Sequence, residues 1–260
     1  MQNGGLKALL LDLDDTLIDN SMDTFIPAYF RALEAFVAGV VEPGKFIEEL
    51  LKATRAMDHN EGTGPTNEEI FAAAFYPALE VPREEMEPLL ARFYNEAFPQ
   101  LEPLTGRRPA APKIVEWAKG RGLQVVIATN PLFPRTAIEQ RMAWGRVGVD
   151  LFDYELVTCY ENSHATKSSP AYFREIVEFL GRQPGECLMV GDNWGWDAVC
   201  AGEAGIPSYW IASDGVLPPV PPEPVVELVG RGDLNSFLTA AEDGSLEVCW
   251  AERADRGLAV

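Results

Sequence analysis

Near the N-terminus the sequence reads Leu9-Leu10-Leu11-Asp12-Leu13-Asp14-Asp15-Thr16-Leu17, an apolar run that ends abruptly in three carboxylates. In an extended strand the side chains alternate between two faces, so Asp12 and Asp14 are expected on the same side where the strand gives way to a loop. Two like charges at that point repel each other, and an unpaired carboxylate is costly to bury. The stretch therefore implies a metal ion, a substrate, or both.

Composition limits the classes of protein to which the chain can belong. Its 260 residues are 47% hydrophobic, which is enough for a substantial core in one large or two modest domains. The 21 basic and 40 acidic side chains give a net charge of −19, which argues against binding to nucleic acid or to anionic membrane surfaces. We find neither a membrane-spanning run nor a signal peptide, so we expect a cytoplasmic protein.

The pattern of apolar residues predicts an α/β fold with an inserted helical domain. Residues 6–13 are interpreted as a buried strand. Apolar residues then recur at helical spacing in four runs between 23 and 98. From residue 105 onward, predicted helices at 111–121, 134–144, 170–181 and 195–204 alternate with predicted strands at 124–129, 155–160, 187–190 and 206–211. This order is typical of a doubly wound, Rossmann-like parallel sheet.

The first strand is expected to belong to that sheet although the helical block separates it in sequence. The predicted domains are therefore a discontinuous core of residues 1–17 and 105–260 and an all-helical cap domain of residues 18–104. Residues 99–112, with four prolines and a glycine, are interpreted as a linker. The polar loop 58–66 inside the helical block is either a specificity loop or an ordinary helix connection.

Polar residues follow four of the predicted strands, where ligands bind in open α/β sheets. Asp12, Asp14, Asp15 and Thr16 follow the first strand, and Thr129 and Asn130 follow the second. Lys167 comes after the third. The fourth ends in Gly191-Asp192-Asn193, with Asp197 four residues further on. Taken alone, Thr129, Lys167 or Asp197 could be an ordinary structural residue, but all four groups are expected to face one crevice.

In this order the residues resemble the four motifs of the haloacid dehalogenase-like hydrolase superfamily, which are DxDx(T/V), a strand-ending Ser or Thr, a Lys, and GDxxxxD. The match covers about residues 5–21 and 105–212. The helical block lies where the superfamily's first type of cap domain is inserted. The chain departs from the usual pattern in that Lys167 is followed by two serines before Pro170, where many relatives have proline next to the lysine.

The resemblance implies a Mg²⁺-dependent phosphatase that hydrolyses a small phosphorylated metabolite. Asp12 would be the nucleophile that forms an aspartyl-phosphate, and Asp14 would protonate the leaving alcohol and then activate water. Mg²⁺ would be held by the Asp12 carboxylate, the Asp14 backbone carbonyl and the Asp192 carboxylate. The remaining roles would be phosphate binding by Thr129, Asn130 and Lys167, and support from Asp197 and Asn193 behind the metal ligands.

Alternative functions stay open on sequence grounds. Asp14 argues against a dehalogenase, since a halide leaving group needs no proton, but a phosphomutase of the same architecture would use the same residues. A phosphonate hydrolase would need a cap lysine able to form a Schiff base, and the cap offers Lys45 and Lys52. A regulator that only binds a ligand is less consistent with an acid placed two residues from a nucleophile.

Some properties are not decided by the motifs. The oligomeric state is expected to be monomer or homodimer, and the substrate is not identified. Weaker candidates for the site are His59, His164, Trp194 and Trp196. The four cysteines form no CxxC pair, so free and mostly buried thiols are expected and a zinc site is poorly supported.

Overall fold

Strand β1 (Ala8–Leu11) lies in the interior of a six-stranded parallel sheet in the computed structural model, which describes residues 5–213, 215–219 and 226–256. The strand order is β5-β4-β1-β6-β7-β8. The other strands are β4 (Gln124–Ile127), β5 (Leu156–Val157), β6 (Cys187–Gly191), β7 (Ser208–Ile211) and β8 (Leu228–Gly232). Because β4 and β6 pair with β1 on its two sides, the ends of these three strands lie next to one another.

The alternation of side chains along β1 serves two hydrophobic cores, one on each face of the sheet. Leu9 and Leu11 pack in the first core, and Ala8 and Leu10 in the second. The first core is covered by α5 (Ala110–Gly120), α6 (Arg135–Trp144), α9 (Leu234–Asp243) and α10 (Ser245–Arg256). The second is covered by α7 (Pro170–Leu180) and by the helical turns of 194–203. Helices on both faces confirm the predicted doubly wound fold.

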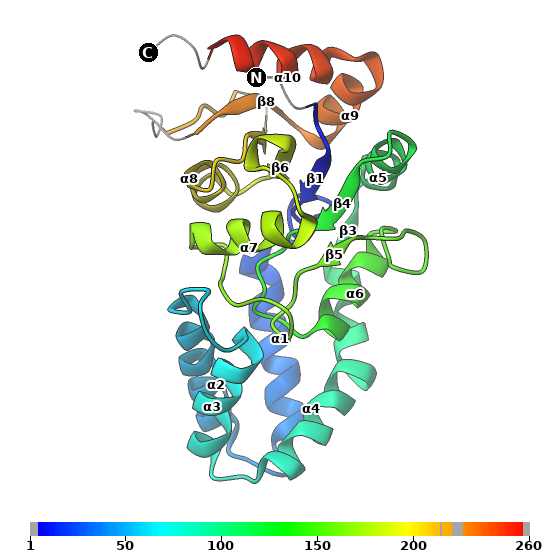
Figure 1. Cartoon of the computed structure of the whole chain (residues 1–260). Coiled ribbons are helices and arrows are strands. Elements are labelled where there is room, and N and C mark those ends of the chain that lie inside the picture. The colour runs from blue at the N-terminus through cyan, green and yellow to red at the C-terminus, as the bar shows by residue number, and fades with distance from the viewer. Residues whose placement is uncertain (1–4, 214, 220–225, 257–260) are drawn as a thin grey trace.

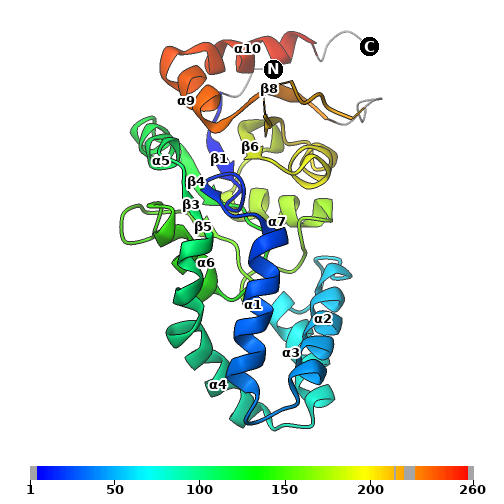
Figure 2. The same ribbon diagram turned by 180° about the vertical axis from the view of Figure 1, so that it is seen from behind.

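Four helices follow β1 in sequence and gather at one end of the molecule, below the sheet in Figures 1 and 2. They are α1 (Met22–Val37), α2 (Pro43–Asp58), α3 (Asn67–Leu79) and α4 (Arg83–Glu96). Their apolar faces form a third hydrophobic cluster, rich in aromatic rings. This arrangement confirms the inserted helical block, while the domain limits at 17, 18, 104 and 105 stay predictions.

The two chain segments that join this block to the sheet lie side by side. Strand β2 (Ile18–Asp19) pairs antiparallel with β3 (Gly106–Arg107) in a separate two-stranded sheet. The predicted linker of residues 99–112 has regular structure, since it overlaps the 3₁₀ helix Phe98–Leu104 and contains β3 and the start of α5. Pro99 lies in the first turn of the 3₁₀ helix. Backbone N–H groups in a first turn have no acceptor within the helix, so a proline there costs no hydrogen bond.

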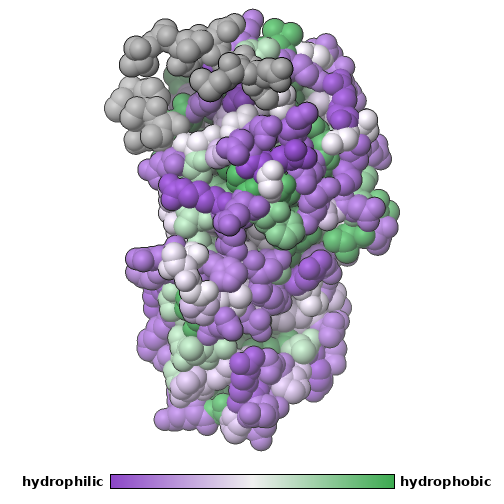
Figure 3. Space-filling model, in the orientation of Figure 1, coloured by the Kyte–Doolittle hydropathy of each residue, from purple (hydrophilic) through white to green (hydrophobic). Residues whose placement is uncertain are grey.

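The exposed surface in Figure 3 is mostly hydrophilic, with smaller patches of apolar atoms between the charged side chains. None of the described helices has both the length and the apolar character needed to cross a bilayer. The four cysteines are free thiols, and Cys159 and Cys187 are buried.

Candidate active site

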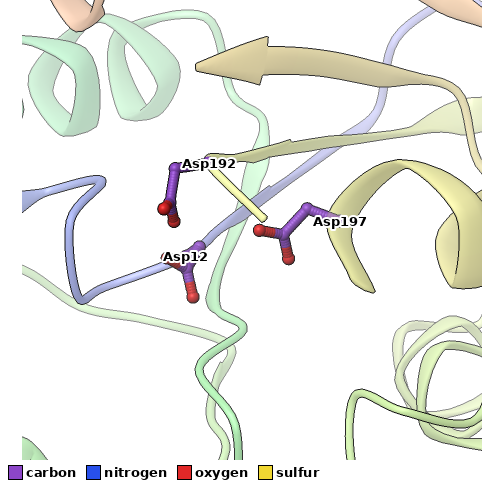
Figure 4. A group of neighbouring side chains, drawn as sticks. All are labelled: Asp12, Asp192 and Asp197. Atoms are coloured by element: carbon purple, nitrogen blue, oxygen red, sulfur yellow. The ribbon is translucent and has the colours of Figure 1, made fainter. Parts of the chain in front are cut away.

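Three aspartates from separate parts of the chain come together at the carboxyl end of the sheet (Figure 4). Asp12 follows β1, Asp192 follows β6, and Asp197 lies on the π-helical turn Trp194–Cys200. Each offers a carboxylate oxygen, and these oxygens lie within 4.8 Å of one another. The backbone N–H of Asp12 donates to the carbonyl of Val190 at 2.9 Å, so the pairing of β1 with β6 continues up to the site.

Lys167 supplies a positive charge between two of these carboxylates. Its Nζ lies 2.7 Å from Asp12 Oδ1 and 2.6 Å from Asp197 Oδ1, and only 1% of its side chain is exposed. Burial alone would lower the pKa of Lys167, but the carboxylates of Asp12 and Asp197 outweigh it and raise that pKa above its ordinary value. Lys167 is therefore a fixed ammonium in direct contact with the predicted nucleophile.

The negative charge of Asp192 is less well compensated than the charges of Asp12 and Asp197, which both contact Lys167. Its side chain accepts a 3.3 Å hydrogen bond from the hydroxyl of Thr16. Burial, and then the negative charge of Asp12, raise the pKa of Asp192 well above its ordinary value. A buried carboxylate that is repelled by a neighbouring carboxylate favours a bound cation, because the cation offsets both negative charges.

Asp197 is held in place by the backbone around it. Its Oδ2 accepts a hydrogen bond of 3.0 Å from the backbone N–H of Asn193, whose own side chain caps the π-helical turn. Gly191 leaves room for this side chain, since a Cβ at that position would lie 2.2 Å from Asp197 Oδ2. Lys167 contacts the other carboxylate oxygen of Asp197 at 2.6 Å.

Asp14 points to a different set of partners from those of Asp12. Its Oδ2 forms an ion pair with Nη1 of Arg141, and its Oδ1 accepts a 2.6 Å hydrogen bond from Asn20. Burial raises the pKa of Asp14, whereas the charge of Arg141 and the bond from Asn20 lower it. Neither Arg141 nor Asn20 was predicted from the sequence.

A sequence signal for Arg141 does exist in retrospect. It lies four residues after Ala137 and three after Ile138, and both of these are buried residues of α6. An arginine on the apolar face of a helix requires a buried partner. Asn20 carries no comparable signal.

Thr129 and Asn130 follow β4, as predicted. The backbone carbonyl of Thr129 accepts hydrogen bonds from the hydroxyls of Thr158 at 2.8 Å and Tyr172 at 2.9 Å, which fixes the end of the strand. The side-chain oxygen of Asn130 accepts a 3.2 Å hydrogen bond from the backbone N–H of Lys167. The Asn130 side chain thus connects two of the predicted motifs.

All of the sequence-predicted site residues line one cavity of about 390 Å³. They are Asp12, Asp14, Thr129, Asn130, Lys167, Asp192, Asn193 and Asp197. Asp15 and Trp196 also line it, and Met22 and Ile26 of α1 contribute apolar walls from the helical block. Four segments that are far apart in sequence therefore bring their polar side chains to one cavity, whose other walls are apolar.

Of the weaker candidates, Trp196 lines the cavity, whereas the other three lie in other environments. Trp194 packs against Trp210 with ring centroids 5.0 Å apart, His164 contacts Glu175 at 2.6 Å, and His59 contacts the carbonyl of Arg55. Lys45 and Lys52 of α2 form ion pairs with glutamates at the surface, and neither lines the cavity. They give no support to a Schiff-base mechanism.

The loop 58–66 does not line the cavity, so it has no direct contact with a ligand there. The start of α3 behind it is tied to the sheet domain instead. The buried side chain of Asn67 donates to the carbonyl of Ala165 at 3.1 Å and accepts from Asn60 at 2.9 Å. Its backbone N–H donates to the carbonyl of Ser163 at 2.8 Å.

The carboxylates fit a divalent cation with hard oxygen ligands. Asp12 and Asp192 lie close together, and a single lysine offsets their charges. Carboxylate oxygens are the ligands that Mg²⁺ prefers. Both oxygens of Asp197 are already engaged by Lys167 and Asn193, and the Asp14 side chain is engaged by Arg141. Asp12 and Asp192 are thus the side chains best placed to hold a metal ion.

The sequence is similar to those of two phosphatases. Phosphoserine phosphatase from Thermus thermophilus is 27% identical, in an alignment that covers 90% of this chain and 99% of that protein. Phosphoglycolate phosphatase 1 from Pseudomonas aeruginosa is 23% identical over 77% of this chain and 67% of that protein.

Solved structures with the same fold include enzymes of different reaction types. A phosphatase from Thermococcus onnurineus aligns with a TM-score of 0.55 and 22% identity, covering 90% of this chain and 97% of the other. A 2-haloacid dehalogenase from Pseudomonas syringae aligns with a TM-score of 0.60 and 18% identity, covering 92% and 99%. At these identities the likeness concerns the fold alone.

The sequence as a whole assigns the chain to one family. The haloacid dehalogenase-like hydrolase family matches residues 6–205. That range includes β1, the helical block, and the segments that carry Thr129, Lys167 and Asp192. The protein is therefore a member of the haloacid dehalogenase-like hydrolase family.

Proposed function

We propose that this hydrolase is a Mg²⁺-dependent phosphatase that acts on a small phosphate monoester through an aspartyl-phosphate on Asp12. The observation that carries the proposal is the pair of aspartates two residues apart with different partners. Asp12 contacts Lys167 at 2.7 Å beside Asp192, while Asp14 is bound by Arg141 and Asn20. This difference supports attack by Asp12 and proton transfer by Asp14.

In the first step a carboxylate oxygen of Asp12 forms a bond to phosphorus as the ester P–O bond breaks. The leaving alcohol oxygen takes a proton from Asp14. In the second step Asp14 accepts a proton from water, the water oxygen bonds to phosphorus, and the acyl P–O bond breaks. Inorganic phosphate leaves and the Asp12 carboxylate is restored.

The remaining side chains would offset the charge that makes this attack difficult. Lys167 and the hydroxyl of Thr129 would bind the phosphoryl oxygens, and Asp197 would keep Lys167 in position. Asp12, Asp192 and the backbone carbonyl of Asp14 would hold the metal ion. When bound, Mg²⁺ neutralises negative charge between the carboxylate and the phosphoryl group.

We further propose that residues 18–104 act as a cap domain over this cavity. Met22 and Ile26 of α1 already line it, so the helical block forms part of its wall. The hinges would lie near residues 17–21 and 101–106, next to the paired strands β2 and β3. Closure of such a cap would exclude bulk water from the acyl-phosphate.

The test is phosphate release from an aryl phosphate with Mg²⁺ present. Asp12→Asn should abolish turnover while the protein stays folded by circular dichroism, because the amide cannot attack phosphorus. A matched control is Asp23→Asn, which alters an exposed carboxylate of α1 outside the cavity and should keep full activity. Near-full activity of Asp12→Asn would refute the mechanism. With a sugar phosphate as the substrate, isomerisation without net phosphate release would indicate a mutase instead.

A further inference from the structure

A second cavity of about 400 Å³ lies beside the first, between the helical block and the sheet domain. Ile26, Leu132 and Phe133 line both cavities, so they meet along these side chains. The predicted nucleophile faces only the first cavity. The second is thus placed to receive the part of a substrate that extends away from the phosphoryl group.

The wall of this second cavity is largely apolar and aromatic. It is built by side chains from all four helices of the block and from the segment after β4. Its members on the helices include Phe30, Leu33, Leu50, Phe71, Tyr76 and Leu90. Aromatic and aliphatic walls of this kind stabilise bound ligands mainly by removing apolar surface from water.

The charges around the two cavities are almost all negative. Among the described residues that line them, Lys167 is the only one with a positively charged side chain, and it already contacts Asp12 and Asp197. Glu87 and Glu161 line the second cavity. A substrate with a carboxylate next to its phosphate ester, such as phosphoglycolate, would find no free cation there.

Two hydroxyl groups of this wall, those of Tyr29 and Tyr94, hydrogen bond to each other at 2.8 Å. Burial raises the pKa of Tyr29 to about 12, so this hydroxyl stays neutral. The wall therefore favours an organic group that is both uncharged and largely apolar.

We infer that the substrate is the phosphate monoester of an uncharged, apolar alcohol, whose carbon skeleton occupies the second cavity while its phosphoryl group lies against Asp12. This inference rests on the proposed phosphatase activity. The volume admits a skeleton of more than one ring or a branched chain, since a cavity of roughly 150 Å³ accommodates benzene.

The test measures kcat/KM for phosphate release with the full chain and Mg²⁺, using n-alkyl phosphates from ethyl to hexyl together with phosphoglycolate and phosphoserine. Burying one methylene contributes about 0.8 kcal/mol, so kcat/KM should rise about fourfold per methylene. Phosphoglycolate, which is close in size to ethyl phosphate, should be a poorer substrate than ethyl phosphate.

A matched pair of variants in α4 tests the location. Leu90 and Leu89 are adjacent and partly buried, but only Leu90 lines the cavity. Leu90→Lys should lower kcat/KM for hexyl phosphate at least tenfold relative to ethyl phosphate and favour phosphoglycolate, whereas Leu89→Lys should leave both ratios unchanged. Leu90→Ala, which adds no charge, should flatten the dependence on chain length if the lysine variants do not fold.

The outcomes separate the two proposals. Phosphate release that is independent of chain length, or a preference for phosphoglycolate in the wild type, would overturn the substrate class and leave the phosphatase intact. Equal effects of Leu90→Lys and Leu89→Lys on the hexyl-to-ethyl ratio would also overturn it. No phosphate release from any ester, phenyl phosphate included, would overturn both.

Discussion

Asp14 and Arg141 form an ion pair in which the arginine is almost completely buried, with 1% of its side chain exposed against 17% for the aspartate. The guanidinium also lies over the ring of Phe133, with Cζ 4.6 Å from the ring centroid. Phe133 in turn lines both cavities. Arg141 of α6 therefore holds Asp14, the proposed proton-transfer residue, and also packs against a residue that lines both cavities.

Removing one partner of this pair should destabilise the protein. Arg141→Met leaves the Asp14 carboxylate without its buried counter-charge, and such a change costs about 3–5 kcal/mol of the free energy of unfolding. Urea denaturation measures the loss. The double variant Asp14→Asn/Arg141→Met should recover part of it, because neither charge then remains. Equal stability of Arg141→Met and the wild type would show that the pair does not contribute to folding.

Asp14→Asn should separate the two chemical steps. An alkyl alcohol needs a proton to leave, so its phosphate ester should lose about 10²–10⁴-fold in rate. The p-nitrophenolate ion leaves without a proton, so p-nitrophenyl phosphate should still phosphorylate Asp12 in the variant. The resulting aspartyl-phosphate should then be hydrolysed slowly. Rapid-mixing absorbance should show a burst of about one p-nitrophenolate per enzyme. Equal loss for both esters with no burst would mean that Asp14 does not transfer the proton.

Mg²⁺ should stabilise the folded protein through Asp12 and Asp192. A ligand that binds only the native state adds about 2.7 kcal/mol at one hundred times its Kd, so the melting temperature should rise with added Mg²⁺ and fall with chelator. Asp192→Asn should weaken this response, although relief of repulsion with Asp12 should raise the stability of the metal-free protein. Asp58→Asn, at an exposed position outside the cavity, is the control. A full Mg²⁺ response in Asp192→Asn would contradict the assignment.

The sequence was sufficient to predict five of the six strands of the sheet and the polar residues that follow them, because both depend on local patterns. A buried strand that ends in Asp12, and a second that ends in Gly191-Asp192, place their polar ends at the same edge of a parallel sheet, and the pairing of β1 with β6 makes them neighbours. Arg141 was beyond such reasoning, since its partner Asp14 lies 127 residues away and only the packing of α6 brings the two together. The second cavity likewise depends on how four helices meet.

The regular structure within the 99–112 segment was missed for a different reason. Its prolines and glycine were interpreted as a linker, but proline is also compatible with the first turn of a helix. Pro99 is the second residue of a 3₁₀ helix, and Pro109 immediately precedes α5. Composition alone does not distinguish the two situations, whereas the hydrogen bonds of the following residues do.

Asn67 should control how firmly the helical block is attached to the sheet domain. Its buried amide bonds to the carbonyl of Ala165, close to Lys167, so Asn67→Ala leaves buried polar atoms without their partner at a cost of about 1–3 kcal/mol. We expect faster hydrogen exchange of the Glu68 N–H, which donates to the carbonyl of Tyr160 at 2.8 Å. Thr63→Ala, in the exposed loop, should leave this exchange unchanged. If the two variants exchange alike at Glu68, the Asn67 side chain does not hold the two parts together.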